Sequence, residues 1–235
     1  MRWMQLAKVT ALIPCAGQGN RMGGTVNKPY LEVYDRPLLA YTLDKFQSHS
    51  LVDEIILIAK SDEVEYCKQE IVHKYSFTKV SSVVVGGLER QDSVRSGLAA
   101  VDAETEWIIV HDGVRPLVTA ETISRALNTA FVHQTAVVGV PVKDTIKIVH
   151  ADLTVKETPD RTSLWQVQTP QVFRKDILLE AYKKAYLSGW RGTDDASLVE
   201  KYGRQVWMVR GEYSNIKVTT PEDLLYVKEM IRVDE

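Results

Sequence analysis

Residues 11–30 read ALIPCAGQGNRMGGTVNKPY, and the organisation that we predict for the rest of the chain follows from this stretch. Its apolar, β-branched beginning at 9–13 predicts a buried strand, and the loop after it carries four glycines together with Arg21 and Lys28. Glycines let backbone N–H groups approach a phosphate closely, and the two cations supply the charge that a polyphosphate needs. The alternative is a flexible turn between a strand and a helix with two solvated cations. We predict a phosphate-binding loop.

Two common nucleotide-binding motifs do not match this loop. A dinucleotide fingerprint, G-x-G-x-x-G, needs glycine three residues beyond Gly19, where Met22 stands. A Walker A loop needs G-K-[ST], but Gly24 is followed directly by Thr25. What remains, G-x-G-x-R-M followed by N-K-P, resembles the loop that wraps the nucleotide triphosphate in sugar-phosphate nucleotidyltransferases.

Length and composition predict one soluble α/β domain over residues 1–235. The net charge of −2 gives no reason to expect nucleic acid or an anionic membrane as a partner. No apolar run approaches the ~20 residues of a membrane span, and the first residues lack the apolar core of a signal peptide. We therefore expect a cytoplasmic protein. Cys15 and Cys67 lie too far apart in the sequence for a disulfide framework or a zinc site.

Apolar strands alternate with helices along most of the chain, which predicts a Rossmann-like, mostly parallel sheet with helices on both faces. We expect strands at 9–14, 54–59, 79–85, 107–110, 136–142 and 205–209. We expect helices at 36–49, 62–74, 91–101, 121–132, 174–187 and 196–202, and a last helix that begins at Pro221. Asp92 or Ser93 could cap the helix at 91–101, and Thr219 or Thr220 the last one.

The pattern changes at about 143–168. Residues 145–149 and 153–158 alternate between apolar and polar, as the strands of a β-hairpin do. This hairpin has too little apolar surface for a core element, and an isolated hairpin is only marginally stable in water. We therefore expect a protruding arm that packs on a second copy of the chain and makes a homodimer. The alternative is a flap folded on its own domain.

Candidate site residues follow the ends of the predicted strands, where an open α/β sheet binds its ligands. The third strand leads to GGLERQDSV at 86–94. Its two glycines allow close approach of a flat base, and Ser93 offers a hydroxyl. The alternative for Ser93 is plain helix capping, which does not exclude contact with a ligand.

Two further candidates carry charge. The fourth strand leads to HDGVRP at 111–116, and the carboxylate of Asp112 needs a cation, a metal or a polar ligand nearby. It could instead be a structural partner of Arg115. Lys217 stands alone in an apolar segment, either as a site residue or as a surface lysine whose stem is buried. We interpret His111 as a packing residue at the strand end.

The chain carries, in order, the motifs G-Q-G-N-R-M, N-K, G-G-x-E-R-x-D-S-V, H-D-x-x-R-P, K-D-T, D-R, L-W-x-x-x-T-P-Q, T-D-D-A-S and N-I-K-V-T-x-P-E-D. This ordered set resembles the 2-C-methyl-D-erythritol 4-phosphate cytidylyltransferases, which act in the non-mevalonate route to isoprenoids. The match runs from about Val9 to Asp223. The related ribitol-5-phosphate cytidylyltransferases share most of the motifs. The resemblance implies the nucleotide-diphospho-sugar transferase type of fold and CTP as a substrate.

The resemblance also implies residue roles. The residues implied for CTP binding are Cys15, Ala16, Gly17, Gly19, Gly87, Leu88, Arg90 and Ser93. Those implied for catalysis are Arg21, Lys28, Arg161 and Lys217. Those implied for binding a polyol phosphate acceptor are Asp112, Arg115, Thr145, Val167 and Thr169. Arg161, Val167 and Thr169 would reach the acceptor from the partner's arm.

Two positions depart from the family pattern. Cys15 stands where alanine is common, a change between small residues that we expect to be tolerated. Leu88 stands where some members have aspartate, so any contact with the base there would be through the backbone.

The charge of the acceptor phosphate determines the mechanism that we expect. A phosphate monoester is largely dianionic near neutral pH, with a second pKa of about 6, and needs no general base to become a nucleophile. Catalysis is then positioning plus electrostatic stabilisation by Arg21, Lys28 and a Mg²⁺ held mainly by the CTP phosphates. We expect no metal-ligating residues on the chain, because the histidines show no ligand spacing.

Three functions remain open at this point. The first is CMP transfer from CTP to 2-C-methyl-D-erythritol 4-phosphate. The second changes only the acceptor, to ribitol 5-phosphate or a similar polyol phosphate. The third is a catalytically silent module that binds CTP as a regulatory ligand. The presence of Arg21, Lys28, Asp112, Arg161 and Lys217 together speaks against the third, since binding alone would not require them all.

Overall fold

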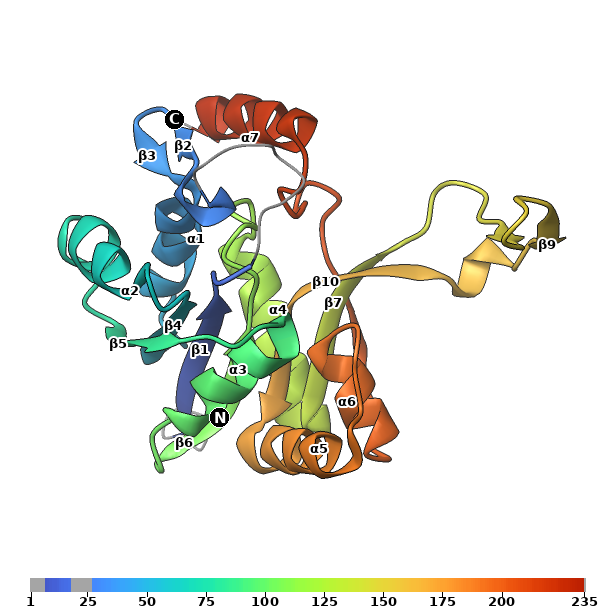
Figure 1. Cartoon of the computed structure of the whole chain (residues 1–235), viewed down its shortest axis with the longest axis horizontal. Helices are drawn as coiled ribbons and strands as arrows, with labels where there is room; N and C mark the ends of the chain where they lie inside the picture. Colours follow the sequence, from blue (N-terminus) through green and yellow to red (C-terminus); the bar gives the residue numbers. More distant parts are fainter. Residues whose placement is uncertain (1–6, 18–26, 235) are drawn as a thin grey trace.

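The computed structural model describes residues 7–17 and 27–234, and a seven-stranded sheet lies at its centre (Figure 1). The strands are β1 (Lys8–Pro14), β4 (Glu54–Ala59), β5 (Val80–Val85), β6 (Thr105–Val110), β7 (Thr135–Pro141), β10 (Trp165–Arg174) and β11 (Met208–Arg210). Their order is β11-β7-β10-β6-β1-β4-β5, and β10 runs antiparallel to both neighbours while the other pairs are parallel. The predicted mostly parallel α/β sheet is therefore confirmed.

Helices cover both faces of the sheet, because successive side chains of each strand point to opposite faces. In β1, Ala11 and Ile13 belong to one buried apolar cluster and Leu12 to the other. The first cluster is closed by α1 (Leu38–Gln47), α4 (Ala120–His133) and the π-helical segment η2 (Cys67–His73). The second is closed by α3 (Arg90–Ala99), α5 (Lys175–Ser188) and α6 (Asp195–Lys201). None of the helices within 7–17 and 27–234 has the length and apolar character needed to cross a membrane.

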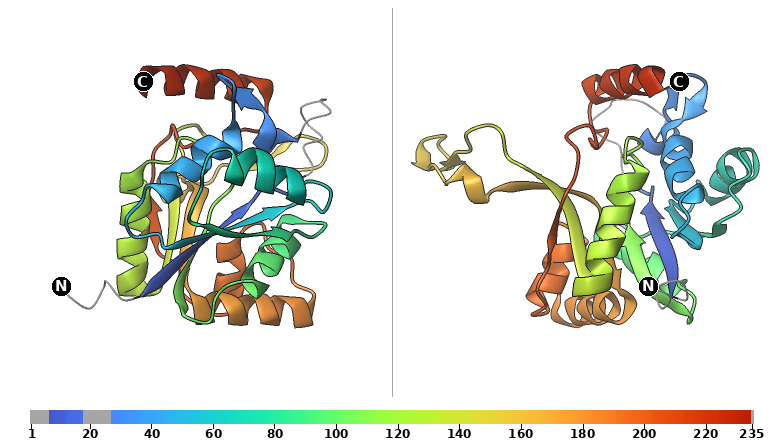
Figure 2. Two further views of the ribbon diagram at one scale, coloured as in Figure 1. Left: turned by 90° about the vertical axis from the view of Figure 1, so that its left-hand side faces the viewer. Right: turned by 180° about the vertical axis from the view of Figure 1, so that it is seen from behind.

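The last helix, α7 (Pro221–Asp234), lies across one end of the molecule, beside the small hairpin of β2 (Glu32–Val33) and β3 (Arg36–Pro37) (Figure 2). Its predicted cap at Thr220 is confirmed. The backbone N–H of Asp223 donates to Thr220 Oγ1 at 3.3 Å, and the N–H of Thr220 donates to Asp223 Oδ2 at 2.9 Å. This reciprocal capping fixes where the preceding segment, 215–219, runs past the ends of the strands.

Some helix boundaries differ from the prediction. The first helix begins at Leu38, because Arg36 and Pro37 pair with 32–33 in the hairpin. The helix predicted at 62–74 is a short α2 (Val64–Tyr66) that continues as η2. The helix α3 begins already at Arg90, and its N-cap residue is Glu89. Capping by Asp92 or Ser93 was therefore a wrong prediction.

The strand β10 is the largest element that the sequence did not predict. It lies in the middle of the sheet between β6 and β7. Its central residues include the polar Gln168, Thr169 and Gln171, all buried, and this removes the apolar pattern by which a core strand is recognised. The three polar side chains form hydrogen bonds within the domain, which offsets the cost of burying them.

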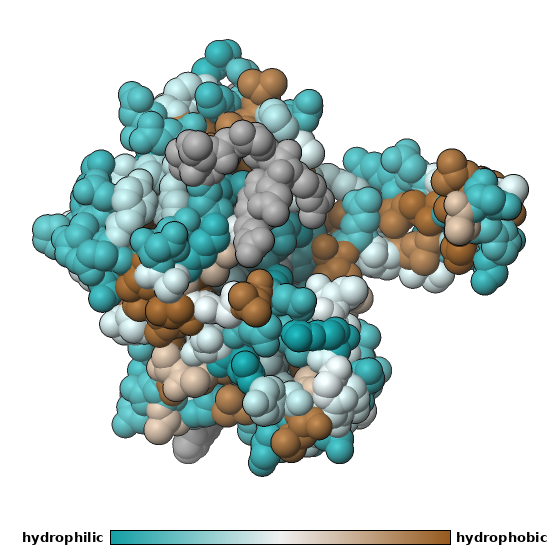
Figure 3. Space-filling view, in the orientation of Figure 1, coloured by the Kyte–Doolittle hydropathy of each residue, from teal (hydrophilic) through white to brown (hydrophobic). Residues whose placement is uncertain are grey.

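The predicted hairpin is present as an arm that leaves the domain (Figure 1). Its strands β8 (Ile148–Val149) and β9 (Val155–Glu157) form a small antiparallel sheet, and every side chain from 143 to 158 is exposed. The flap alternative is therefore wrong. Apolar side chains gather along the arm (Figure 3), among them Leu153, which is 81% exposed. Large apolar groups that face solvent together mark an interaction surface.

Candidate active site

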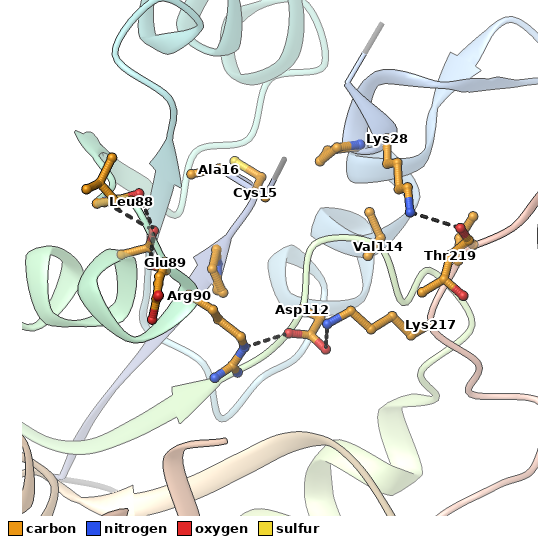
Figure 4. Close-up of a pocket in the computed structure, with 16 residues that line it drawn as sticks. Cys15, Ala16, Lys28, Leu88, Glu89, Arg90, Asp112, Val114, Lys217 and Thr219 are labelled. Atoms are coloured by element: carbon orange, nitrogen blue, oxygen red, sulfur yellow. Dashed lines mark hydrogen bonds and ion pairs between the residues drawn. The ribbon is translucent and has the colours of Figure 1, made fainter. Parts of the chain in front are cut away.

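The turn after the predicted phosphate loop is fixed by Asn27. The Asn27 Oδ1 atom accepts the N–H of Lys28, the first residue of the 3-10 turn η1 (Lys28–Tyr30), at 3.0 Å. The Asn27 amide donates to Glu63 Oε2 at 3.0 Å and to the carbonyl of Cys15 at 3.4 Å. Both ends of the loop are thus held together, and Lys28 Nζ reaches across to the carbonyl of Thr219 at 2.9 Å (Figure 4).

A cavity of ≈ 330 Å³ lies at the carboxyl ends of β1, β5 and β6 (Figure 4). The predicted residues that line it are Cys15, Ala16, Gly17, Lys28, Gly87, Leu88, Arg90, Ser93, Asp112 and Lys217. Two other predicted residues, Gly19 and Arg21, lie outside the described residues. Motifs that are far apart in the sequence therefore meet at one edge of the sheet, where parallel strands place their ligands.

The start of α3 forms one wall of this cavity. Ser93 Oγ accepts the N–H of Gly87 at 3.2 Å and donates to the carbonyl of Glu89 at 3.0 Å, which folds the turn before the helix. A Cβ atom at Gly87 would overlap the side chain of Asp92, so this turn requires glycine. The side chain of Leu88 is 91% exposed and brings no polar group to the cavity.

Asp112 is the charged centre of the site. Its carboxylate oxygens lie 3.1 Å from Arg90 Nε, 3.1 Å from Lys217 Nζ and 3.3 Å from Arg115 Nε, and the residue is 6% exposed. Burial raises the pKa of the Asp112 carboxyl, but the charges of Arg90, Lys217 and Arg115 outweigh burial and hold it well below its usual range. Asp112 is therefore a partner of Arg115, which was the structural interpretation of this residue. It also holds the side chains of Arg90 and Lys217.

The sequence did not single out Asp195, although it lies in the quoted T-D-D-A-S motif. Asp195 is completely buried on α6, its Oδ2 lies 2.8 Å from Arg90 Nη2, and its Oδ1 accepts the hydroxyl of Tyr182 at 2.5 Å. Burial lowers the pKa of the Arg90 guanidinium, but Asp195 and Asp112 outweigh burial and raise it above its usual value. An acidic residue in the first turn of a helix is common, so the motif alone gave no reason to expect a buried ion pair.

A second cavity of ≈ 420 Å³ lies next to the first and shares the walls formed by Arg90, Asp112 and Lys217. The predicted acceptor residues that also line it are Arg115, Val167 and Thr169. Three residues separate Val167 from Gln171 in β10, whereas their partners Gly139 and Val137 in β7 are separated by one. This bulge redirects the side chains between Val167 and Gln171, among them Thr169.

The position of Thr169 corrects one expectation. Its hydroxyl accepts the backbone N–H of Asp112 at 3.1 Å and lies 3.1 Å from His111 Nδ1, and the residue is buried in its own sheet. Val167 also lines the cavity of its own chain. The expectation that Thr169 and Val167 reach the acceptor from a partner's arm was therefore wrong.

Among the predicted residues that the structure describes, Thr145 and Arg161 are the two that do not lie at the site. Both are exposed on the arm, and neither lines either of the two cavities. Arg161 Nη1 donates to the carbonyl of Lys143 at 2.8 Å, at the base of the arm.

His111 is a structural residue with a defined proton. Its Nε2 lies 3.2 Å from the carbonyl of Arg115, so Nε2 carries the proton, and Nδ1 accepts the hydroxyl of Thr169. The ring is completely buried and packs against Phe46, with 4.9 Å between the ring centroids. Burial lowers the pKa of His111 to about 3, so the ring is neutral in the folded protein at physiological pH.

The described residues do not form a metal centre. Within 7–17 and 27–234, no group of three or more His, Cys, Asp or Glu side chains is placed to hold a metal ion. The carboxylate of Asp112 in the cavity is already satisfied by three cations. These described donors therefore do not fit a resident metal.

We expect the neutral His111 to make the fold sensitive to mild acid. Its pKa is about 6.5 in an unfolded chain and lower in the folded one, so the unfolded state binds the extra proton. The free energy of unfolding should therefore fall by about 2–3 kcal/mol between pH 6.5 and pH 4.5. Urea unfolding at a series of pH values measures this change. His111→Gln, which keeps a donor for the Arg115 carbonyl, should lose most of this pH dependence, and an equal dependence in both proteins would contradict the assignment.

Comparisons with known proteins agree with this geometry. The sequence model of the family described as "IspD: 2-C-methyl-D-erythritol 4-phosphate cytidylyltransferase" matches residues 9–232. Relatives with that name include a protein of Geotalea uraniireducens, 47% identical over 96% of this chain and 97% of its own length. Another, from Alkaliphilus metalliredigens, is 49% identical over 93% of this chain and 91% of its own length.

Solved structures give the same result. The 4-diphosphocytidyl-2C-methyl-D-erythritol synthase of Anaerococcus prevotii superposes with a TM-score of 0.84 at 34% identity, covering 96% of this chain and 99% of that one. The 2-C-methyl-D-erythritol 4-phosphate cytidylyltransferase of Thermus thermophilus superposes with a TM-score of 0.79 at 30% identity, with the same coverage. The chain therefore belongs to the 2-C-methyl-D-erythritol 4-phosphate cytidylyltransferase family.

Proposed function

We propose that this chain transfers CMP from CTP to 2-C-methyl-D-erythritol 4-phosphate, which gives 4-diphosphocytidyl-2-C-methyl-D-erythritol and pyrophosphate in the non-mevalonate route to isoprenoids. Membership of the family makes the chain a nucleotidyltransferase that uses CTP. The observation that carries the assignment is the pair of adjoining cavities with Arg90, Asp112 and Lys217 in their shared wall. Two anionic substrates that must react with each other need such a shared, cationic boundary.

The first cavity fits the nucleotide. The glycine turn at Gly87 and the backbone at Leu88 leave room for a flat base, and the hydroxyl of Ser93 holds that turn in place. The triphosphate would follow the chain at 15–17 toward Lys28, whose ammonium group lies on the opposite wall.

The second cavity fits the acceptor phosphate. Arg115 and Lys217 provide two positive charges, while Asp112 keeps both side chains in place. The acceptor phosphate would attack the α-phosphate of CTP in line with the departing pyrophosphate. Lys28, together with Arg21, would stabilise the charge that accumulates on the α-phosphate. Because the nucleophile is already an anion, no side chain has to remove a proton from it.

A Mg²⁺ ion bound to the CTP phosphates would reduce the repulsion between the two substrates. We assign the ion to the nucleotide because the described residues around the first cavity offer no free cluster of carboxylates. The chain's own contribution is then to align the phosphates and to supply fixed positive charge.

We also propose that the working form is a homodimer in which each arm serves the other copy. The exposed apolar side chains of the arm, Ile148, Val149, Leu153 and Val155, support this proposal because they need a covering surface. Arg161 and Thr145 support it as well, since neither lines either of the two cavities of its own domain. The arm would bring both residues to the acceptor cavity of the partner.

Pyrophosphate release tests the proposed reaction. With Mg²⁺ and CTP, we expect turnover with 2-C-methyl-D-erythritol 4-phosphate and little with ribitol 5-phosphate, while ATP and UTP serve as nucleotide controls. Preference for ribitol 5-phosphate would keep the mechanism and change the pathway. Tight CTP binding without turnover on either acceptor would favour the silent module instead.

Replacing either catalytic cation should lower turnover without unfolding the chain. Losing one preorganised donor to the transition state costs about 10²–10³ in rate. We expect Lys28→Ala and Arg21→Ala each to show at least that loss, with circular dichroism like that of the unchanged protein. Lys183→Ala removes a lysine that is 68% exposed on α5 and is the matched control. Turnover near normal in both variants would refute the assignment of these two cations.

Mixing two inactive variants tests whether the arm acts in the partner. In a mixed dimer of Lys28→Ala and Arg161→Ala chains, one site would combine an intact Lys28 with an intact Arg161 from the other copy. Statistical mixing should then restore about a quarter of the normal activity, because half of the dimers are mixed and each has one complete site. If Arg161 acts in its own chain, no site is complete, and mixing should restore nothing.

A further inference from the structure

A continuous chain of charged contacts runs from the core to the boundary between the two cavities. Tyr182 on α5 donates to Asp195 on α6, Asp195 pairs with Arg90, and Arg90 pairs with Asp112. Asp112 in turn holds Lys217. Figure 4 shows the last part of this chain, with the carboxylate of Asp112 between the side chains of Arg90 and Lys217.

Asp195 has no place in either cavity. It is completely buried, and the residues that line the two cavities include its neighbour Asp194 but not Asp195 itself. Burying a carboxylate is costly even when it is paired, and an apolar residue would often serve stability as well or better. A buried carboxylate that touches no ligand but holds a residue that lines the site therefore suggests a positioning role.

The geometry at Arg90 shows what is positioned. The guanidinium lies between two carboxylates: its Nε donates to Asp112 Oδ1 at 3.1 Å, and its Nη2 lies 2.8 Å from Asp195 Oδ2. The second contact is an ion pair without hydrogen-bond geometry, so Asp195 holds this end of the group by charge. Arg90 is the side chain of α3 that lines both cavities, and it is 28% exposed there. With only one carboxylate, the planar group could rotate about the remaining contact.

The charges around this point almost cancel. Three cations, Arg90, Arg115 and Lys217, face two carboxylates, Asp112 and Asp195, so this group carries one net positive charge. Two further carboxylates, Asp194 and Glu200, also line the acceptor cavity, so the placement of each cation there matters more than the total charge. Without the charge of Asp195, Arg90 would bind Asp112 alone and compete with Arg115 and Lys217 for it. Those two cations would then lose the contact that aims them at the acceptor cavity.

We propose that Asp195 is a positioning residue that holds Arg90 on the boundary between the cavities and thereby aligns Asp112, Arg115 and Lys217 for the acceptor phosphate. This inference rests on the proposed function. It predicts a larger effect on the acceptor than on CTP. Arg90, Asp112 and Lys217 line both cavities, but Arg115 lines only the acceptor cavity, and the Gly87–Ser93 turn and the Asn27 contacts of the nucleotide cavity do not involve Asp195.

Steady-state kinetics on Asp195→Asn, with CTP and 2-C-methyl-D-erythritol 4-phosphate varied in turn, tests the proposal. Asparagine keeps the volume and removes the charge. We expect the KM for the acceptor to rise at least about tenfold while the KM for CTP changes less than about threefold. An acceptor KM within about threefold of normal would overturn the proposal, and so would an equal rise in both KM values.

A second variant and a control guard against a simple folding effect. Arg90→Lys keeps the positive charge but cannot bridge two carboxylates, so its acceptor KM should rise more than its KM for CTP, even though Arg90 lines both cavities. The double variant should be no worse than the more affected single variant, because both changes break one arrangement. If Asp195→Asn does not fold, Arg90→Lys decides alone, and a normal acceptor KM in that variant overturns the proposal.

Thr105→Val is the matched control. It replaces a buried hydrogen-bonding side chain by one of similar shape at the opposite end of β6, where Thr105 Oγ1 lies 2.7 Å from Thr10 Oγ1. Both KM values should remain within about threefold of normal. The same assay keeps the two possible failures apart. An unchanged protein without turnover rejects the proposed function and this inference with it, whereas normal turnover with an unaffected Asp195→Asn rejects only the inference.

Discussion

The carboxylate of Asp112 is the interaction on which the site depends. It lies just beyond the end of β6 and contacts side chains from three other places in the chain: Arg90 at the start of α3, Arg115 in the following loop, and Lys217 before α7. A single buried negative charge would be unstable, and three positive charges so close together would repel one another. The three cations offset the cost of burying the carboxylate, and the carboxylate reduces the repulsion between the cations. The result is a rigid group of cations beside two cavities.

The sequence was most informative where a residue pattern has a single strong physical cause. Apolar β-branched runs predicted the parallel strands, and the motifs that follow them predicted most of the side chains around the first cavity. Alternation in 145–149 and 153–158, combined with a lack of apolar bulk, predicted an arm that does not fold on its own domain. In these cases the local pattern and the overall fold favour the same structure, so the structure can be predicted from the pattern.

Other features could not be predicted from the sequence, because they depend on contacts between distant parts of the chain. The strand β10 is recognisable only when the hydrogen-bond partners of its buried polar side chains are known. Asp195 looks like an ordinary residue at a helix start until α6 is packed against α3 and α5. The bulge that turns Thr169 toward Asp112 depends on the register with β7, which no single-strand pattern contains.

The continuity of β10 with the arm limits how this protein can change in length. Residues near Leu153, at the tip of the arm, could be added or removed without altering the strands of the domain, although such a change would alter the apolar surface that we propose meets the partner. One residue inserted between Trp165 and Val167 would instead break the register of this segment with β7. Variation in length among related chains should therefore be confined to the tip, whereas the return strand keeps a constant spacing.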